Sequence, residues 1–418
     1  MVTGFSRLND EEVFKQCQTY GANHYPRYDL IIRTAEGVWL FDVKNNRYLD
    51  CLAAYSAANQ GHHHPRIVQA VAGALQNNYG SVLSNMVYTD VLGIFYEKLN
   101  KLLPQLAPRF GEHGNKILPK NGGVESVETA IKMMRYYGYK EKGITDGKQE
   151  IIVFENNFHG RMITEVSYST TKKYKEGFGP LTPGFIAVEF GNIDAVRDAI
   201  TDNTCGILVE PMQGEGGMYQ PPDGFLKDLR ELADEKDIIL TFDEIQVGLG
   251  RTGKMFCFEH ENVVPDGLIL GKAISGGVIP LSVFAANSRL MDIAFNPGSD
   301  GSTYGGYPLA CVAGCAALNV IVEEKLALRS EQMGAVLKKK IEEIASRSDK
   351  VKEVRGRGLF IGIELHDGDA MKYCKKLLDL GVLTNDSHGH TLRISPPLII
   401  TEEQIEYLVE RLDEALVK

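Results

Sequence analysis

The stretch FDEIQ, residues 242–246, ends an apolar run in two carboxylates and an amide. Asp243 directly follows IILTF, a run typical of a buried strand, so we expect its carboxylate at the carboxyl end of that strand. Ligands of parallel sheets bind at this end, where a partly desolvated acid needs a cation or a strong donor. Taken alone, Asp243 has a second interpretation of equal weight, because aspartate also commonly caps a turn.

Lys272 in GLILGKAISGG favours the first interpretation. The apolar LILG before this lysine and the small residues after it are not typical of a surface loop, the usual place of lysine. Apolar surroundings lower the pKa of a lysine and make its amine a usable nucleophile or base. The sequence therefore predicts a reactive amine beyond the end of a second strand.

A pair of glycines opens a helical stretch at NGGVESVETAIKMMRYYGY, residues 121–139. The first backbone N–H groups of such a helix, those of Gly123 and Val124, have no acceptor inside it. They favour a phosphate in front of the helix, although Gly-Gly before a helix is more often only a turn.

An amine for an aldehyde, an acid for a ring nitrogen and a helix N-terminus for a phosphate together describe pyridoxal 5′-phosphate (PLP). Lys272 would bind the aldehyde covalently, and Asp243 would keep the pyridine nitrogen protonated so that the ring accepts electrons. Gln246 could hydrogen-bond the ring hydroxyl. Ile245 would pack on one ring face and Phe158 of ENNFHGR on the other, with core packing as the alternative for Phe158.

The elements that must position these residues alternate between about residues 117 and 285. Short apolar runs alternate there with helical stretches, and the runs are KILPKN, EIIVFEN, GFIAVEF, CGILVEP, DIILTFDEI, GLILGK and PLSVFAAN. This alternation is typical of a parallel-rich sheet covered by helices, that is, of an α/β fold. We expect a large cofactor-binding domain at residues 55–310.

The two ends of the chain predict further units. GVWLFDVKNNRYLDCL predicts a hairpin whose strands, 38–43 and 47–52, flank a turn at Asn45 and Asn46. We expect the segment 1–54 to pack with a smaller α+β domain at residues 311–418. That domain begins with one long helix, roughly 308–347, followed by strand, helix, strand and helix.

Composition limits the possible partners. The chain has 418 residues, and its net charge of -10 argues against nucleic acid, which requires clustered basic residues. No segment approaches the roughly 18 apolar residues of a membrane span, and MVTGFSRLNDEEVFK carries no export signal. The seven cysteines are scattered without a CxxC pair, which favours the reducing cytoplasm. We expect small-molecule substrates.

A metal site is not expected. The run GHHHP, with His62, His63 and His64, attracts attention, but consecutive side chains on an extended segment point to alternate faces and do not easily share one ion. We expect these histidines to be structural.

Six motifs in order, NGGVE, NNFHGR, VEPMQGEGG, FDEIQVGLGRTG, LGKAISGG and GSTYGG, resemble those of the class III (omega) aminotransferases. The resemblance runs over essentially the whole chain. It implies PLP fold type I, as in aspartate aminotransferase, with a mainly parallel seven-stranded sheet in the large domain. It also implies a homodimer with active sites at the subunit interface, where Ser302 and Thr303 would contact the phosphate bound by the other subunit.

Within the family, YGANHYPRYDL, LAAYSAANQGHHHP, FGPLTPGF and HGHTLRISPPLIIT resemble members that act on the delta-amine of ornithine. The resemblance implies that Tyr25 and Arg161 grip the alpha-amino acid end of ornithine and that Tyr55 lines the same pocket. An arginine offers a bidentate fork for a carboxylate, and a phenol fixes orientation from the side. Glu210 of VEPMQGEGG is also expected in the substrate site.

Arg393 would bind the alpha-carboxylate of 2-oxoglutarate or glutamate in the other half reaction. Glu215 could neutralise Arg393 while ornithine is bound and release it when the dicarboxylate arrives. Out of context, the commoner roles are a loop carboxylate facing water for Glu215 and a salt bridge at a strand edge for Arg393.

The resemblance therefore implies transfer of the delta-amino group of L-ornithine to 2-oxoglutarate by a ping-pong mechanism. The products would be glutamate and glutamate-5-semialdehyde, which closes to pyrroline-5-carboxylate. Two departures limit this expectation: His159 stands where the animal ornithine enzymes have Trp, and Gly122 where Thr is more familiar.

His159 resembles the form in enzymes for acetylornithine, which are the first alternative and are expected to lack the pair Tyr25 and Tyr55. Another omega-amino acid, such as 4-aminobutyrate, is a further alternative substrate. A PLP-dependent decarboxylase or isomerase on the same fold is the remaining one, because one scaffold hosts several reactions.

Overall fold

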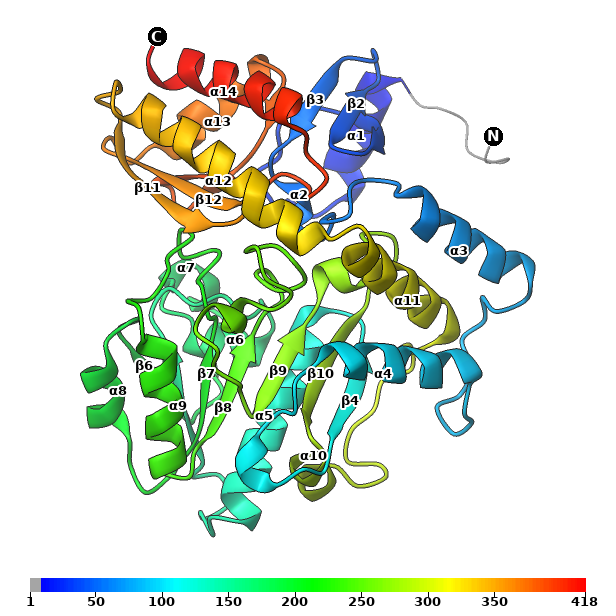
Figure 1. The fold of residues 1–418 in the computed structure, drawn as a ribbon, viewed down its shortest axis with the longest axis vertical. Coiled ribbons are helices and arrows are strands. Elements are labelled where there is room, and N and C mark those ends of the chain that lie inside the picture. Colours follow the sequence, from blue (N-terminus) through cyan, green and yellow to red (C-terminus); the bar gives the residue numbers. More distant parts are fainter. Residues whose placement is uncertain (1–8) are drawn as a thin grey trace.

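The computed structural model describes residues 9–418. Part of the stretch that was searched for an export signal, residues 1–8, lies outside this range. The chain folds into a large part around one sheet and a smaller part that contains elements from both ends of the chain (Figure 1). Within residues 9–418, no helix combines the length and apolar character that a membrane crossing requires.

The large part is built on a seven-stranded sheet in the order β4-β10-β9-β8-β7-β5-β6. β10 runs antiparallel to both of its neighbours, and the remaining neighbouring strands are parallel. The strands are β4 (Asn115–Lys120), β5 (Glu150–Phe154), β6 (Phe185–Val188), β7 (Thr204–Val209), β8 (Ile239–Asp243), β9 (Gly267–Leu270) and β10 (Ser282–Asn287). Each predicted apolar run forms one of them, so the predicted α/β fold with a mainly parallel sheet is confirmed.

Helices cover the sheet, and the central strands are buried along their whole length. The helices of this part are α3 (Pro65–Gln76), α4 (Asp90–Leu102), α5 (Gly123–Lys140), α6 (Ile163–Tyr168), α7 (Lys172–Lys175), α8 (Ile193–Ala199), α9 (Phe225–Glu235) and α10 (Ser288–Ala294). The glycine on β7 lets α5 lie close, because a Cβ at Gly206 would stand 2.4 Å from the sulfur of Met134.

The single long helix expected at 308–347 is wrong. Two helices, α11 (Pro308–Glu323) and α12 (Leu326–Ala345), occupy this stretch, and Lys325 between them adopts a left-handed backbone with φ of 53°. The break lets each helix pack on a different part: α11 contacts α3 and α4, whereas α12 packs on β11 and α14. In Figure 1 the two helices lie end to end across the boundary between the parts.

The smaller part contains an antiparallel sheet in the order β11-β12-β15-β14. Its strands are β11 (Val351–Arg357), β12 (Phe360–Leu365), β14 (Asp386–Ser387) and β15 (Thr391–Ile394). α12 and α13 (Ala370–Asp379) pack on this sheet, and α14 (Glu402–Leu416) packs on these two helices. The expected alternation of strand and helix is present, with the extra short strands β13 (Val382–Leu383) and β14.

The N-terminal strands join this smaller part. The predicted hairpin is confirmed as β2 (Trp39–Asp42) and β3 (Arg47–Asp50), to which β1 (Ile32–Glu36) adds an edge. β1 was not expected from its sequence, because most of its side chains are exposed and show no alternation. β13 pairs in parallel with β3, so α1 (Asp10–Tyr20) and these strands lie beside the C-terminal helices (Figure 1). The domain boundaries given above stay a prediction.

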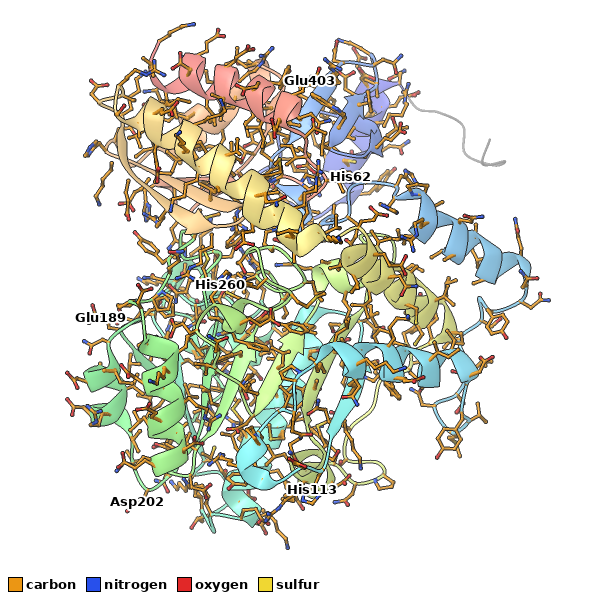
Figure 2. All side chains as sticks on the ribbon, in the orientation of Figure 1. His62, His113, Glu189, Asp202, His260 and Glu403 are labelled. Atoms are coloured by element: carbon orange, nitrogen blue, oxygen red, sulfur yellow. The ribbon has the colours of Figure 1, made fainter. Side chains whose placement is uncertain are left out.

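The three consecutive histidines have separate partners, two of them with carboxylates: His62 pairs with Asp50 at 2.7 Å and His64 with Glu324. The ring of His63 contacts the carbonyl of Ala35. Figure 2 shows the labelled His62, His113 and His260 in three different regions of the molecule. The described part of the chain holds no cluster of three or more ligating side chains suited to a metal ion.

Candidate active site

A pocket opens at the carboxyl ends of β8 and β9, in front of the N-terminus of α5. β8 ends at Asp243, which pairs with Ile269 of β9. Lys272 follows Ile269 by three residues and begins a short 3₁₀ helix. The pocket is lined by Gly123, Val124, Phe158, His159, Gly160, Glu210, Met212, Asp243, Ile245, Gln246, Val247 and Lys272. Five separate segments thus converge, and they include every residue of this subunit expected to hold the cofactor.

The N-terminus of α5 forms one wall of the pocket. The Glu125 carboxylate accepts hydrogen bonds from the backbone amides of Asn121 (2.6 Å) and Gly122 (3.1 Å). The next two amides, of Gly123 and Val124, have no acceptor inside the helix and border the pocket. They offer donors and the positive end of an 18-residue helix to an anion.

Ile245 lies between two glycines. A Cβ on Gly123 would stand 2.7 Å from its Cδ1, and one on Gly271 would stand 3.3 Å from its side chain. The absence of side chains at these positions lets the helix N-terminus and the turn before Lys272 approach the same isoleucine. The result is an apolar surface beside Asp243, where a flat ring can pack.

Asp243 is 4% exposed and is held from two directions. One carboxylate oxygen lies 2.7 Å from His159 Nδ1, and the other accepts a hydrogen bond of 3.0 Å from the Ile245 amide. Burial disfavours the His159 imidazolium, but the hydrogen bond and charge of Asp243 outweigh it and raise the pKa of His159. The raised pKa favours the protonated imidazole, whose Nδ1 donates to the Asp243 carboxylate.

Sequence reasoning gave His159 no role in the site and used it only in the comparison with ornithine and acetylornithine enzymes. A usable signal was present, because His159 directly follows Phe158 in a loop that was already assigned to the cofactor.

The adjacent carboxylates of FDEIQ have different tasks. Glu244 accepts hydrogen bonds from the backbone amides of Cys257 (2.7 Å) and Phe258 (2.8 Å), and it is 1% exposed. It therefore fixes the following loop, whereas Asp243 borders the pocket.

Lys272 enters the pocket from the turn after β9. Burial, the largest effect, lowers the pKa of its amine to about 8, against the opposing charge of Glu215. A substantial fraction of the amine is therefore neutral near this pH and able to act as a nucleophile or base.

Glu210 also borders the pocket, with its pKa raised to about 7 by burial above all. Its two oxygens accept hydrogen bonds from the backbone amides of Phe158 (3.0 Å) and Gly214 (3.2 Å). Its visible contacts thus hold two loops of the pocket, and its part in substrate binding stays a prediction.

Arg393, Glu215 and Gln246 form a closed group of hydrogen bonds next to the pocket. Arg393 is 0% exposed, and its guanidinium donates to Glu215 Oε1 at 2.5 Å and to Gln246 Oε1 at 3.0 Å. Gln246 Nε2 donates to Glu215 Oε1 at 3.2 Å. Burial favours the neutral form of Glu215, but the charges of Arg393 and Lys272 outweigh it and lower the pKa of the carboxyl.

This grouping brings Glu215 and Arg393 together as expected and gives Gln246 protein partners. Glu215 is bound to Arg393 instead of facing water, and the salt bridge of Arg393 is buried on β15, a strand between two others, instead of at a strand edge. The expected contact of Gln246 with the cofactor hydroxyl stays a prediction.

Two of the residues expected around ornithine are Tyr55 and Tyr25. The Arg393 guanidinium is 5.0 Å from the Tyr55 ring centroid, and the Tyr55 hydroxyl accepts a hydrogen bond of 3.3 Å from Asn385. Tyr25 is 49% exposed. Burial above all raises the pKa values of Tyr55 and Tyr174, and the nearby Tyr25 phenol adds to this.

Arg161 is exposed and rests on an aromatic platform. Its guanidinium lies 4.1 Å from the ring centroid of Tyr174 and 5.6 Å from that of Phe158. Tyr174, which orients Arg161, was not expected from the sequence. Its helix, α7, carries no recognisable motif.

Ser302 and Thr303 do not line the pocket of their own chain. The Ser302 hydroxyl oxygen accepts hydrogen bonds from the Asn121 side chain (3.1 Å) and from the Gly305 amide (3.0 Å), and Thr303 is exposed. Their expected contact with a phosphate in another subunit stays a prediction.

The donor set fits PLP. Free amides at a helix N-terminus suit the phosphate, the Asp243 carboxylate suits a protonated ring nitrogen, and Lys272 suits the aldehyde. The missing Cβ atoms at Gly123 and Gly271 let Ile245 pack between the helix N-terminus and the turn before Lys272, and Ile245 offers an apolar side chain to a ring in the pocket.

The family described as Aminotransferase class-III matches residues 20–416. An ornithine aminotransferase of Geobacillus sp. (strain WCH70) is 47% identical over 401 residues, which cover 96% of this chain and 97% of that protein. Among solved structures, the ornithine aminotransferase of Toxoplasma gondii, with PLP at partial occupancy in its active site, has a TM-score of 0.92 and 35% identity, covering 98% of this chain and 94% of that one. The acetylornithine aminotransferase of Elizabethkingia anophelis has a TM-score of 0.86 and 37% identity, covering 98% and 100%. The chain therefore belongs to the class III aminotransferase family.

Proposed function

We propose that the protein transfers the delta-amino group of L-ornithine to 2-oxoglutarate. The observation that carries this proposal is the buried Arg393 masked by Glu215 beside Lys272. A maskable arginine suits a site that alternates between a substrate with one carboxylate and a substrate with two. The ornithine aminotransferases of Geobacillus and Toxoplasma, named above, support the same substrate.

As a class III aminotransferase the protein works with PLP, which supplies an aldehyde for the substrate amine and a ring that takes up electrons from the reacting carbon. Lys272 Nζ removes a proton from the substrate carbon that bears the amine and later returns one. Asp243, fixed by His159 and by the Ile245 amide, would pair with the ring nitrogen of the cofactor. Gly123 and Val124 would anchor the phosphate through their amides.

In the first half reaction, Arg161 and Tyr25 bind the alpha-carboxylate end of ornithine, and Tyr55 lines the same side. This places the delta-amine, at the other end of the molecule, towards Lys272. Glu215 remains paired with Arg393 and neutralises its charge. Arg393 therefore does not attract the carboxylate of ornithine. The product, glutamate-5-semialdehyde, closes to pyrroline-5-carboxylate.

In the second half reaction, Glu215 leaves Arg393, which then binds the alpha-carboxylate of 2-oxoglutarate in a bidentate pair. The amino group retained from ornithine replaces the keto oxygen, which leaves as water, and glutamate is released. Because the two substrates use one site in turn, the kinetics are ping-pong.

The experiment that tests this function mixes purified, PLP-loaded protein with ornithine and, separately, with N-acetylornithine, and follows the absorbance of the bound cofactor. We expect faster conversion with ornithine and a matching yield of glutamate after 2-oxoglutarate is added. Ornithine consumed without glutamate formation would indicate a decarboxylase or an isomerase and contradict the proposal.

Acetylornithine is the second candidate substrate. Two observations favour it: the 37% identity to the Elizabethkingia enzyme and the residue His159. Replacement of both Tyr25 and Tyr55 by Phe separates the candidates. If ornithine is the substrate, the double variant should lose much more rate with ornithine than with N-acetylornithine.

We also propose a homodimer in which Ser302 and Thr303 reach the phosphate of the other subunit. The segment 83–88 next to this loop is an exposed apolar patch, in which Met86 is 93% and Tyr88 102% exposed. Asn85 within it donates to the Ser302 carbonyl at 2.6 Å, so patch and loop are joined. Light scattering should give twice the chain mass, and Met86→Glu should give single chains that release PLP faster.

The cytoplasm is the compartment that we propose. All seven cysteines lie within the described residues and are free thiols, as a reducing environment favours.

A further inference from the structure

The loop that carries Glu215, residues 213–219, is rooted in the large part of the molecule. We name these residues the gate loop. A backbone hydrogen bond of 2.9 Å from Gln213 to Tyr219 closes it. The Gln213 side chain donates to the Glu155 carbonyl at 2.7 Å, and the Gly214 amide donates to Glu210 at 3.2 Å. The base of the loop is therefore fixed to the cofactor pocket.

The tip of the gate loop is tied to the small sheet by Arg355 of β11. This arginine is 6% exposed and donates from Nε to the Gly217 carbonyl at 2.7 Å. Its guanidinium carbon lies 3.7 Å from the ring centroid of Tyr219, so it grips both the backbone and the last side chain of the loop.

Glu364 of β12 holds this contact in place. Its carboxylate accepts hydrogen bonds from Arg355 at 2.5 Å, from the Tyr219 hydroxyl at 2.8 Å and from Lys352 at 2.6 Å. Burial opposes its charge, but Lys352, Tyr219 and Arg355 together lower the pKa of the carboxyl to about 2. The tie is therefore charged throughout the working pH range.

Ser387 of β14 binds the backbone of Glu215, the residue that masks Arg393. Its hydroxyl donates to the Glu215 carbonyl and lies 3.4 Å from the Gly214 carbonyl, and the side chain is 1% exposed. β14 pairs with β15, the strand that contains Arg393. The Glu215 backbone and its carboxylate are thus held by two neighbouring strands of the same small sheet.

We infer that Ser387 and Arg355 are positioning residues that fix the Glu215 backbone to the small sheet, so that Arg393 is unmasked by rotation of the Glu215 side chain alone. This inference rests on the proposed function, in which Arg393 receives a dicarboxylate. A fixed backbone keeps the carboxylate within reach of Arg393 and favours the masked state that ornithine needs. A loosened backbone lets the carboxylate leave more often, which favours the dicarboxylate.

The two substrates should consequently respond in opposite directions to Ser387→Ala. Loss of one hydrogen bond changes an equilibrium by about two- to tenfold. We expect the rate of the ornithine half reaction to fall about three- to fivefold and the affinity for a dicarboxylate to rise about two- to threefold. A merely structural defect would weaken both.

Glutarate is the probe for the dicarboxylate, because it lacks a keto group and cannot react. Its dissociation constant is measured calorimetrically on the PLP-loaded dimer, and the ornithine half reaction by stopped-flow absorbance. Ser348→Ala is the matched control, since the Ser348 hydroxyl also donates to a backbone carbonyl, that of Leu416, but lies away from the gate loop. It should change neither quantity.

Arg355→Lys is the second variant, because it keeps a charge beside the buried Glu364 and protects the fold. It should shift both quantities in the same directions as Ser387→Ala. Wild-type protein that reacts with ornithine and binds glutarate, with variants that match it or weaken both ligands, overturns the positioning role alone. Wild-type protein that does neither overturns the proposed function and the inference with it.

Discussion

The floor of the pocket, around Asp243 at the end of β8, and the mask over Arg393, formed by Glu215, each contain a carboxylate. Asp243 is 4% exposed and the Glu215 side chain 19%. The two carboxylates are held differently. Asp243, in the floor, is bound by His159 and by the backbone amide of its own turn. The carboxylate of Glu215, in the mask, accepts hydrogen bonds from the side chains of Arg393 and Gln246 and, among residues 9–418, from no backbone amide. The floor comes from the large part alone, whereas the mask joins the large part to the small sheet.

This difference separates a permanent charge from an exchangeable one. A carboxylate fixed by a backbone amide keeps its place as long as the turn keeps its shape. A carboxylate paired with an arginine side chain can be replaced there by another carboxylate of similar geometry. We therefore expect changes in the floor to affect both half reactions alike and changes in the mask to affect them unequally.

Lys272→Ala should have the largest effect. Without this amine, proton transfer in both half reactions should slow by about 10⁴-fold, the upper range for general acid–base catalysis. Stopped-flow absorbance with ornithine and with 2-oxoglutarate measures the two rates separately. Lys140→Ala, at an exposed position near the end of α5, is the control and should change neither. If one half reaction kept its rate, Lys272 would not serve both half reactions, and the distinction between a shared floor and a selective mask would be wrong.

Arg393→Gln should follow in size. The 2-oxoglutarate half reaction should lose about 10²- to 10³-fold in kcat/KM, because a buried, hydrogen-bonded partner of its carboxylate is gone. The ornithine half reaction should fall less than tenfold. The double variant Arg393→Gln/Glu215→Gln removes the unpaired buried carboxylate and serves as the control for folding. An equal loss in both half reactions would show that Arg393 serves both substrates, as the residues of the floor do.

Glu215→Ala should reverse the selectivity. With Arg393 permanently unmasked, the ornithine half reaction should fall about thirtyfold, a loss near 2 kcal/mol. The second half reaction should change less than fivefold. Glu215→Gln keeps the side-chain size and tests whether the charge itself is needed. Similar effects on both half reactions would argue against an exchangeable mask.

The floor was accessible to sequence reasoning because its residues are adjacent to strand ends. Asp243 and Lys272 follow apolar runs, and parallel strands bring such positions to one edge. The seven runs were recognisable because buried parallel strands are nearly continuous in apolar residues.

The supports of the site were not accessible in this way. The partners of Asp243 and of the gate loop, His159, Arg355 and Ser387, lie 84, 138 and 172 residues away from the groups that they bind. Such pairs leave no local pattern in the sequence. The break at Lys325 was missed for a related reason, since two helices that pack on different parts still show one continuous helical composition.

Glu165→Gln should have the smallest effect on catalysis and a clear effect on stability. Glu165 is 1% exposed, and its oxygens have no hydrogen-bond partner within residues 9–418. Burial, with Glu128 adding to it, raises its pKa to about 8, whereas in the unfolded chain this carboxyl ionises near its ordinary pKa of 4.5. The folded protein therefore binds one proton more than the unfolded chain between these values, and its stability falls as pH rises from about 4.5 to 8.

Glutamine at position 165 cannot ionise, so the variant should not lose stability in this way as the pH rises. We expect the variant to be more stable than the wild type at pH 8 by about 1 to 3 kcal/mol, with no gain at pH 4.5. Urea unfolding at both pH values measures the difference, and the exposed Glu343→Gln is the control. Because Glu165 lies behind His159 and not in the pocket lining, both half reactions should keep their ratio. A gain at pH 4.5 would contradict the raised pKa of Glu165, and a change in that ratio would show that Glu165 belongs to the floor itself.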